Sequence, residues 1–160
     1  WKVTGHANKR DPKTIKTLAL APEILEQKNL ELQKKYQQIE REVSRWESYN
    51  IDKAEIVTVA YGTTSRIVKN AIDILKGEIR VGLIRPQTLW PFPQEPFRVL
   101  PKSVKKILCV EMSCGQMLDD VRLAVNGHYE VGFYGRVGGM IPTPHEVAEA
   151  VRAELMGVAS

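Results

Sequence analysis

Residues 54–77 read AEIVTVAYGTTSRIVKNAIDILKG, and this stretch decides the fold class. Its first seven residues form an apolar, β-branched run that is typical of a buried strand. A glycine turn follows, and Thr64–Lys76 then has the apolar spacing of an amphipathic helix. Gly77 stands where a glycine commonly ends a helix. The stretch therefore predicts one strand–helix unit.

The same pattern recurs three times towards the C-terminus. Further strands are expected at 79–84, 105–111 and 129–134, and further helices near Gln94–Leu100, Gly115–Asn126 and Pro144–Met156. Four strand–helix units of this length imply right-handed crossovers, and hence parallel strands with helices on both faces. We therefore predict an α/β domain over residues 50–160, with three α/β/α layers and a mostly parallel sheet of four to five strands. The order expected for the four main strands is 2-1-3-4.

The N-terminal third has a different character. Residues 1–22 are polar and contain two prolines, which predicts a linker or extended arm, whereas residues 23–49 predict one long helix. An apolar seam on that helix contains Leu25, Leu32, Tyr36, Ile39, Val43 and Trp46, interrupted by Asn29. The seam either packs on its own domain or docks on another domain or subunit, and the second alternative includes self-association through this helix.

Composition excludes several classes of function. The chain has 160 residues with 23 Lys and Arg against 19 Asp and Glu, a net charge of +4. Residues 1–20 hold five basic residues and one acidic residue, so the remainder is neutral overall, unlike a typical nucleic-acid-binding module. No apolar run approaches the length of a membrane span. The two cysteines form no CxxC motif, so neither an iron–sulfur cluster nor a metal site is expected, and a reduced, cytoplasmic location is predicted. Because the sequence begins with Trp, we expect either a piece cut from a longer polypeptide or a processed chain.

The candidate site lies in loops beyond the carboxyl ends of the strands, where α/β sheets gather ligands and interfaces. Interface or anion-binding roles are expected for Gly62, Thr63, Thr64, Ser65, Arg66, Arg85, Glu111, Gln116, Arg136 and Gly138. The GTTSR segment can offer free helix N–H groups to a phosphate, but capping of the helix by its hydroxyl side chains is the favoured interpretation. Arg85 and Glu111 end two strands, and an ion pair between them is predicted.

No catalytic constellation follows from the residues. His6, His128 and His145 lie on separate segments, without a metal ligand at local spacing or a nucleophile beside them. The sequence by itself leaves open a phosphate-, nucleotide- or coenzyme A-binding module.

Four blocks carry a family resemblance. They are VAYGTTSRIVKNAIDILK (59–76), VGLIRPQTLWPFP (81–93), CVEMSCGQMLDDVR (109–122) and YGRVGGMIPTPHEV (134–147). Together they resemble the C-terminal, transketolase-like domain of the alpha subunit of 2-oxoacid:ferredoxin oxidoreductases, with the 2-oxoisovalerate and 2-oxoglutarate enzymes most similar. A C-terminal domain of another transketolase-like enzyme shares the fold but matches the LWPFP and GQM blocks less well.

The resemblance implies a function for the whole complex rather than for this chain alone. Such enzymes decarboxylate a 2-oxoacid oxidatively to an acyl-coenzyme A with thiamine diphosphate, Mg and iron–sulfur clusters, and they reduce ferredoxin. No cofactor contact and no catalytic residue carries over to this chain. The implied role is a structural domain whose partners are the other domains and subunits of the oxidoreductase, with ferredoxin involved indirectly.

Overall fold

The computed structural model describes residues 5–11 and 18–157. Its elements are α1 (Pro22–Val43), β1 (Trp46–Tyr49), β2 (Ile56–Val59), α2 (Gly62–Ile74), β3 (Val81–Pro86), α3 (Glu95–Arg98), β4 (Lys106–Glu111), α4 (Gln116–Val125), β5 (Glu130–Gly135) and α5 (Pro144–Met156). The chain divides into two compact units, with the boundary after Gln38, inside α1. Part of the predicted arm, residues 1–4 and 12–17, lies outside the described residues.

The long helix ends earlier than predicted. It begins at Pro22 and stops at Val43, and no residue of α1 is buried. The predicted extension to residue 49 is wrong, because residues 46–49 form an edge strand instead. The amide of Arg45 donates to the Thr88 hydroxyl at 3.0 Å, and its carbonyl accepts from the Gln87 amide at 2.9 Å. These hydrogen bonds direct the backbone into the sheet, so Trp46 does not belong to the helical seam.

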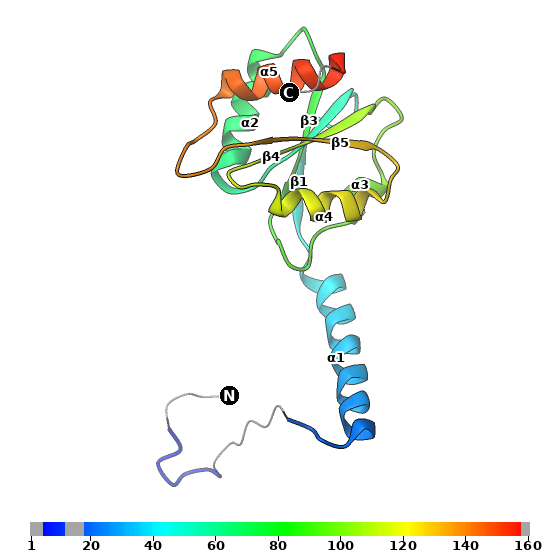
Figure 1. Ribbon diagram of the computed structural model, residues 1–160, viewed down its shortest axis with the longest axis vertical. Coiled ribbons are helices and arrows are strands. Elements are labelled where there is room, and N and C mark those ends of the chain that lie inside the picture. Colours follow the sequence, from blue (N-terminus) through cyan, green and yellow to red (C-terminus); the bar gives the residue numbers. More distant parts are fainter. Residues whose placement is uncertain (1–4, 12–17, 158–160) are drawn as a thin grey trace. The chain divides into compact units, whose positions relative to one another are not determined.

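The predicted fold class and strand order are confirmed. The sheet has five strands in the order β1-β3-β2-β4-β5, in which β3-β2-β4-β5 is the expected 2-1-3-4 arrangement. The four main strands are parallel, and β1 pairs antiparallel with β3. Helices α2 and α5 cover one face of the sheet, and α3 and α4 cover the other (Figure 1).

Side chains that alternate along the strands fill both layers. Ile56, Leu83 and Leu108 pack under α2 and α5, whereas Val57 and Ile107, next to them in sequence, pack under α3 and α4. This period of two follows from the pleat of a strand. Because both faces of the central strands are covered, β2 is buried throughout and β4 from its second residue onward. The core therefore fixes where each strand ends, and with it the positions of the loops.

Candidate functional site

The loop after β2 does not contain the predicted helix cap. Tyr61 occupies the N-cap position of α2, and no side chain caps this helix. The Ser65 hydroxyl donates to the Gly62 carbonyl at 2.7 Å, and Thr64 and Ser65 are both buried. The prediction that the hydroxyl side chains of the GTTSR segment cap α2 is therefore wrong. Gly62 has φ +57°, a left-handed conformation that favours glycine, and Thr63 and Arg66 are exposed beside it.

Arg85 lies on β3 and does not reach Glu111. Its guanidinium Nη1 is 2.9 Å from Oε2 of Glu47, whose Oε1 accepts from Lys69 Nζ at 2.7 Å. Hydrogen bonds from Lys69 and then Arg85 hold the pKa of Glu47 below its usual value. The predicted Arg85–Glu111 pair is wrong, because β2 lies between β3 and β4. The edge strand β1, which the sequence analysis missed, supplies the actual partner.

Glu111 ends β4 and is almost completely buried, with 1% of its surface exposed. Its Oε2 accepts from the Ser113 hydroxyl at 2.6 Å and the Met117 amide at 3.1 Å, and Oε1 accepts from the Leu118 amide at 3.1 Å. Both amides belong to the first turn of α4, where the helix presents N–H groups and partial positive charge. Glu111 therefore fixes the β4–α4 connection and is not available as a general base.

Two neighbours of Glu111 complete this arrangement. The Cys109 Sγ lies 3.7 Å from Oε1 of Glu111, and burial, followed by the Glu111 charge, raises the pKa of the thiol. Gly115 precedes α4 with φ +103°, which favours glycine at this turn. Gln116 is exposed at the start of the helix. Each of these roles falls on one residue of the EMSCGQM segment. Glu111 supplies the carboxylate, Ser113 donates its hydroxyl, Gly115 forms the turn and Gln116 begins α4.

The loop after β5 is held by Arg136 and the start of α5. Arg136 Nη1 lies 2.9 Å from Oε1 of Glu146, and Glu146 forms a capping box with Thr143. Hydrogen bonds from Thr143 are the main cause of the lowered pKa of Glu146, with Arg136 adding to it. Gly138 is exposed with φ +64°. Arg136 thus links the loop to α5.

The strand order brings together all four predicted loops. Strands β3, β2, β4 and β5 are consecutive and parallel, so the loops that follow them lie at the same carboxyl end of the sheet. These loops contain or follow Arg85, Gly62–Arg66, Gln116 and Arg136–Gly138. Arg85 and Glu111 lie on opposite sides of β2 in that order. Across residues 5–11 and 18–157, no three His, Cys, Asp or Glu side chains gather as metal ligands.

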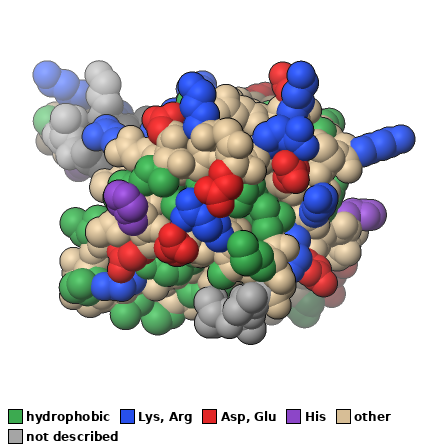
Figure 2. Space-filling view, turned by 90° about the horizontal axis from the view of Figure 1, so that it is seen from above, with side chains coloured by type: hydrophobic (Ala, Val, Ile, Leu, Met, Phe, Trp, Pro, Cys, Tyr) green, Lys and Arg blue, Asp and Glu red, His purple; other side chains and the backbone are tan. Residues whose placement is uncertain are grey.

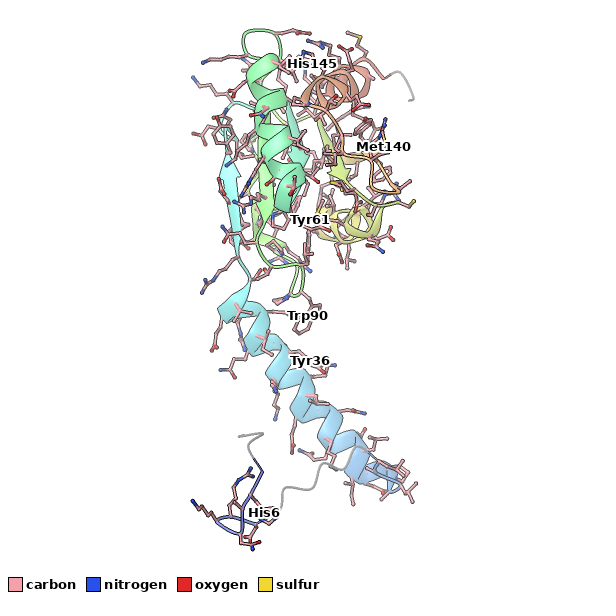
Figure 3. All side chains as sticks on the ribbon, turned by 90° about the vertical axis from the view of Figure 1, so that its left-hand side faces the viewer. His6, Tyr36, Tyr61, Trp90, Met140 and His145 are labelled. Atoms are coloured by element: carbon pink, nitrogen blue, oxygen red, sulfur yellow. The ribbon has the colours of Figure 1, made fainter. Side chains whose placement is uncertain are left out.

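Exposed apolar side chains occur in every one of these loops, and sequence reasoning missed them. They are Tyr61 after β2, Leu89 and Trp90 after β3, Met112 after β4, and Val137, Met140 and Ile141 after β5. Met140 and Ile141 expose 54% and 56% of their surface. Figure 3 labels Tyr61, Trp90 and Met140 on their loops. The detectable signal was the presence of large apolar residues in a glycine-rich loop, since such loops are ordinarily polar. We call these seven residues the apolar edge.

Another face of the domain differs from the apolar edge. Figure 2 shows acidic and basic side chains next to one another, with apolar ones between them. On α5, Arg152 binds Glu78 at 2.7 Å and Glu149 at 2.6 Å. Such neutralised pairs are ordinary for a solvent-facing helix. None of the helices in the described segments is long and apolar enough to cross a membrane.

The LWPFP block lies beside a hollow. Pro91 and Pro93 are buried, whereas Trp90 exposes 63% of its surface, and Phe92 stacks on Phe97 with ring centroids 6.0 Å apart. A hollow of about 530 Å³ is lined by this block together with Trp46, Asp120 and Leu123 among others. Burial is the first cause of the raised pKa of Asp120. The block therefore combines core packing with an exposed aromatic surface.

Comparison with known proteins identifies relatives along most of the chain. The ketoisovalerate oxidoreductase subunit VorB of Methanothermobacter thermautotrophicus is 41% identical over 154 residues, 95% of this chain and 43% of the relative. The 2-oxoglutarate synthase subunit KorA of Methanothermobacter marburgensis is 37% identical over 101 residues, 62% of this chain and 27% of the relative. The chain thus spans less than half the length of these curated relatives.

Two solved structures share the fold. A 2-oxoglutarate:ferredoxin oxidoreductase from Magnetococcus marinus, with 2-oxoglutarate, coenzyme A and succinyl-CoA bound, matches with a TM-score of 0.74 at 21% identity, over 86% of this chain and 24% of that chain. A split-gene transketolase, an inactive beta4 tetramer, matches with a TM-score of 0.60 at 18% identity, over 70% of this chain and 41% of that chain. At these identities the likeness concerns the fold alone.

A family profile covers the part of the domain that contains the parallel sheet. The profile of the pyruvate:ferredoxin oxidoreductase core domain II matches residues 54–147, which include β2 to β5 and the start of α5. All four loops at the carboxyl end of the parallel strands fall inside this match. The chain belongs to the pyruvate:ferredoxin oxidoreductase core domain II family and is homologous to the VorB and KorA subunits of 2-oxoacid:ferredoxin oxidoreductases.

Proposed function

We propose that this chain is part of the alpha subunit of a cytoplasmic, thiamine-diphosphate-dependent 2-oxoacid:ferredoxin oxidoreductase, in which it forms interfaces and carries no catalytic residue. One observation carries the interface role. Among the ionisable residues predicted at the site, Arg85, Glu111 and Arg136 are each occupied by a structural contact within the domain. The groups left exposed around them are mainly the apolar edge. We also propose that the chain consists of an arm over residues 1–22, a long helix and an α/β domain.

The comparison favours a branched-chain substrate for the whole enzyme. The ketoisovalerate relative aligns with 95% of this chain, whereas the 2-oxoglutarate relative aligns with 62%. We therefore propose 2-oxoisovalerate ahead of 2-oxoglutarate. The family match also favours an oxidoreductase over a transketolase.

The iron–sulfur clusters of such an enzyme do not fit the cysteines of this chain. In the complete enzyme, thiamine diphosphate with Mg supports decarboxylation, iron–sulfur clusters pass electrons to ferredoxin, and coenzyme A accepts the acyl group. A cluster requires cysteine ligands, commonly four. This sequence has two cysteines, and Cys109 is buried against Glu111. We propose that the cofactors bind to other domains or subunits.

The apolar edge and α1 are the proposed contacts with the rest of the complex. Apolar patches on loops commonly mark protein interfaces. On α1, Leu25, Leu32 and Tyr36 each expose about 40% of their surface along one seam. The seam suits a helix of another subunit or of a second copy.

Activity assays test the absence of catalysis. The isolated 160-residue chain is expected to show no oxidation of 2-oxoisovalerate, 2-oxoglutarate or pyruvate with a viologen dye. Turnover by the chain alone would overturn the proposal.

Assembly assays test the interface. In the complete oxidoreductase, Met140→Asp is expected to reduce co-purification of the other subunits, because a charge would be buried at the contact. Val99→Asp is the matched control, since Val99 is also an exposed apolar residue, at 68% against 54% for Met140, but lies outside the apolar edge. Equal recovery of subunits with both variants would contradict the interface.

A phosphate- or coenzyme A-binding module is the second candidate. It is favoured by the first turn of α2, which has no side-chain cap and has the exposed Arg66 beside it. Calorimetric titration of the chain with coenzyme A and adenine nucleotides distinguishes the two functions. Binding tighter than about 0.1 mM would favour this second candidate.

A further inference from the structure

Strand β5 is an outer strand of the sheet and lacks the usual features that protect such an edge. Its sequence, EVGFYG, contains no Lys or Pro, and its one charged residue is Glu130 at the start. Within the described residues it pairs with β4 alone. Figure 1 shows β5 running along the sheet margin between α5 and α4. Natural edge strands are ordinarily short, charged or covered, so a six-residue edge strand whose one charge lies at its start is suited to pairing with another strand.

The opposite edge of the sheet is protected. Strand β1 has four residues, and Glu47 near its centre binds both Lys69 and Arg85. A short edge strand and a charged side chain on that strand, here Glu47, both discourage pairing with another strand. The contrast identifies β5 as the edge that can accept a partner.

The backbone of β5 shows which groups are available. The Arg136 amide donates to the Glu111 carbonyl at 3.2 Å, so Arg136 directs its backbone towards β4. Direction alternates along a strand, and Tyr134, Gly132 and Glu130 therefore face β4 as well. Val131, Phe133 and Gly135 direct their N–H and C=O groups outward. No other segment of the described chain hydrogen-bonds to those outward groups.

We propose that β5 pairs antiparallel with β5 of a second copy of this chain, across a two-fold axis at Phe133. This register places outward-facing residues opposite one another: Phe133 opposite Phe133, and Val131 opposite Gly135. It also places Glu130 of each copy opposite Arg136 of the other, which forms two cross-strand ion pairs. Shifting the register by two residues either way keeps the backbone pairing but loses both charge pairs. Charge complementarity therefore selects one register and favours a second copy as the occupant.

Both charged side chains are accessible for this contact. The Glu130 side chain is 79% exposed, although it lies 3.2 Å from Lys106, and the Arg136 side chain is 32% exposed. Arg136 contacts Glu146 through Nη1, and a guanidinium has five N–H donors, so it can bind a second carboxylate. At the axis, the two Phe133 rings form a cross-strand aromatic pair on the α4 side of the joined sheets.

A charge-swap experiment on the full 160-residue chain tests this pairing. Sedimentation velocity is expected to give a dimer of twice the 18.1 kDa chain mass for the unmodified protein. Glu130→Lys and Arg136→Glu alone each create two repulsive pairs, and each is expected to weaken dimerisation about tenfold. An equimolar mixture of the two variants restores both attractive pairs, so it is expected to form a heterodimer. A folding defect would not be rescued by mixing.

A disulfide trap gives a second measurement that does not depend on charge. Glu130 and Arg136 are opposed in the proposed dimer at a non-hydrogen-bonded position, where Cα atoms lie about 4.5 Å apart, within disulfide range. Glu130→Cys/Arg136→Cys in a Cys114→Ser background is expected to form a covalent dimer on mild oxidation, whereas Val99→Cys in that background is not.

Three results would overturn the proposal. One is a monomer at protein concentrations up to about 0.1 mM. Another is dimerisation that is as strong in the Glu130→Lys and Arg136→Glu variants as in the unmodified chain, which would indicate that the two copies associate through α1 instead. The third is equal cross-linking through the control cysteine. None of these results bears on the absence of catalysis in the isolated chain, which is tested separately.

Discussion

Glu111 and Glu47 are two carboxylates of one sheet that are stabilised in opposite ways. Glu111 is buried at the end of a central strand and accepts hydrogen bonds from two backbone amides and a hydroxyl. Glu47 is half-buried on an edge strand and lies between two cations, Lys69 and Arg85. All the partners of Glu111 lie within seven residues of it, whereas those of Glu47 lie 22 and 38 residues away.

The difference shows what each carboxylate does for the fold. Removing a buried acceptor leaves its donors without partners, and each such loss is costly. A half-exposed ion pair is weakened by water and by the entropy of long side chains, so it is worth little. Glu111 is therefore expected to determine the stability of the β4–α4 connection, while Glu47 connects β1 to α2 and β3 with a small net energy.

The largest expected effect comes from Glu111→Ala. The substitution removes the acceptor of three donors and leaves a small cavity, and we expect a loss of about 3 kcal/mol in the free energy of unfolding. Urea denaturation followed by circular dichroism measures it. Glu149→Ala is the control, because the Glu149 side chain is 73% exposed and its partner Arg152 retains Glu78. If the two variants lose equal stability, Glu111 does not hold this turn.

A smaller effect is expected from Ser113→Ala. This change removes one of the three donors and leaves both amide hydrogen bonds of Glu111 intact, so we expect a loss of about 1 kcal/mol. The same denaturation experiment applies, with exposed Ser48→Ala as the control. A Ser113→Ala loss as large as that of Glu111→Ala would mean that the hydroxyl, and not the helix amides, supports the carboxylate.

The same contrast explains how far the sequence could predict the molecule. The strand–helix units around β2 to β5 were predictable because each is encoded by a local apolar pattern followed by a turn. Residues 46–49 were not, because they continue a polar, glycine-free segment after α1 and become a strand only by pairing with β3. The partner of Arg85 was missed for the same reason, since Glu47 lies on the strand that was not predicted.

The loops were predicted better in position than in contacts. The strand order correctly placed Gly62, Gln116 and Arg136 at one edge. The direction of the Ser65 hydroxyl was not predictable, because a serine at this position can either cap the helix or donate to a backbone carbonyl, and in the structure it donates to Gly62. Exposure of the apolar edge depends on the final packing and leaves only a weak trace in the sequence.

A third prediction concerns the cation-bound carboxylate. Glu47→Gln keeps the size of the side chain and removes its charge, and we expect a loss of about 0.5 kcal/mol because both ion pairs are partly exposed. A double-mutant cycle with Lys69→Met isolates the Glu47–Lys69 coupling. A coupling as large as the loss in Glu111→Ala would remove the distinction between the two sites.

The smallest expected effect is the pH dependence of the Glu47 contribution. Hydrogen bonds from Lys69 and Arg85 lower the pKa of Glu47 in the folded protein below the ordinary value of 4.5. A lowered folded-state pKa stabilises the protein above the unfolded-state pKa, and this stabilisation is lost as the pH falls through the folded value. The stability difference between the unmodified chain and Glu47→Gln is therefore expected to be constant from pH 7 to about pH 5 and to shrink by about pH 3. Urea denaturation of both proteins at these pH values measures the difference, and a difference that grows on acidification would contradict the assignment of Lys69 and Arg85 as its cause.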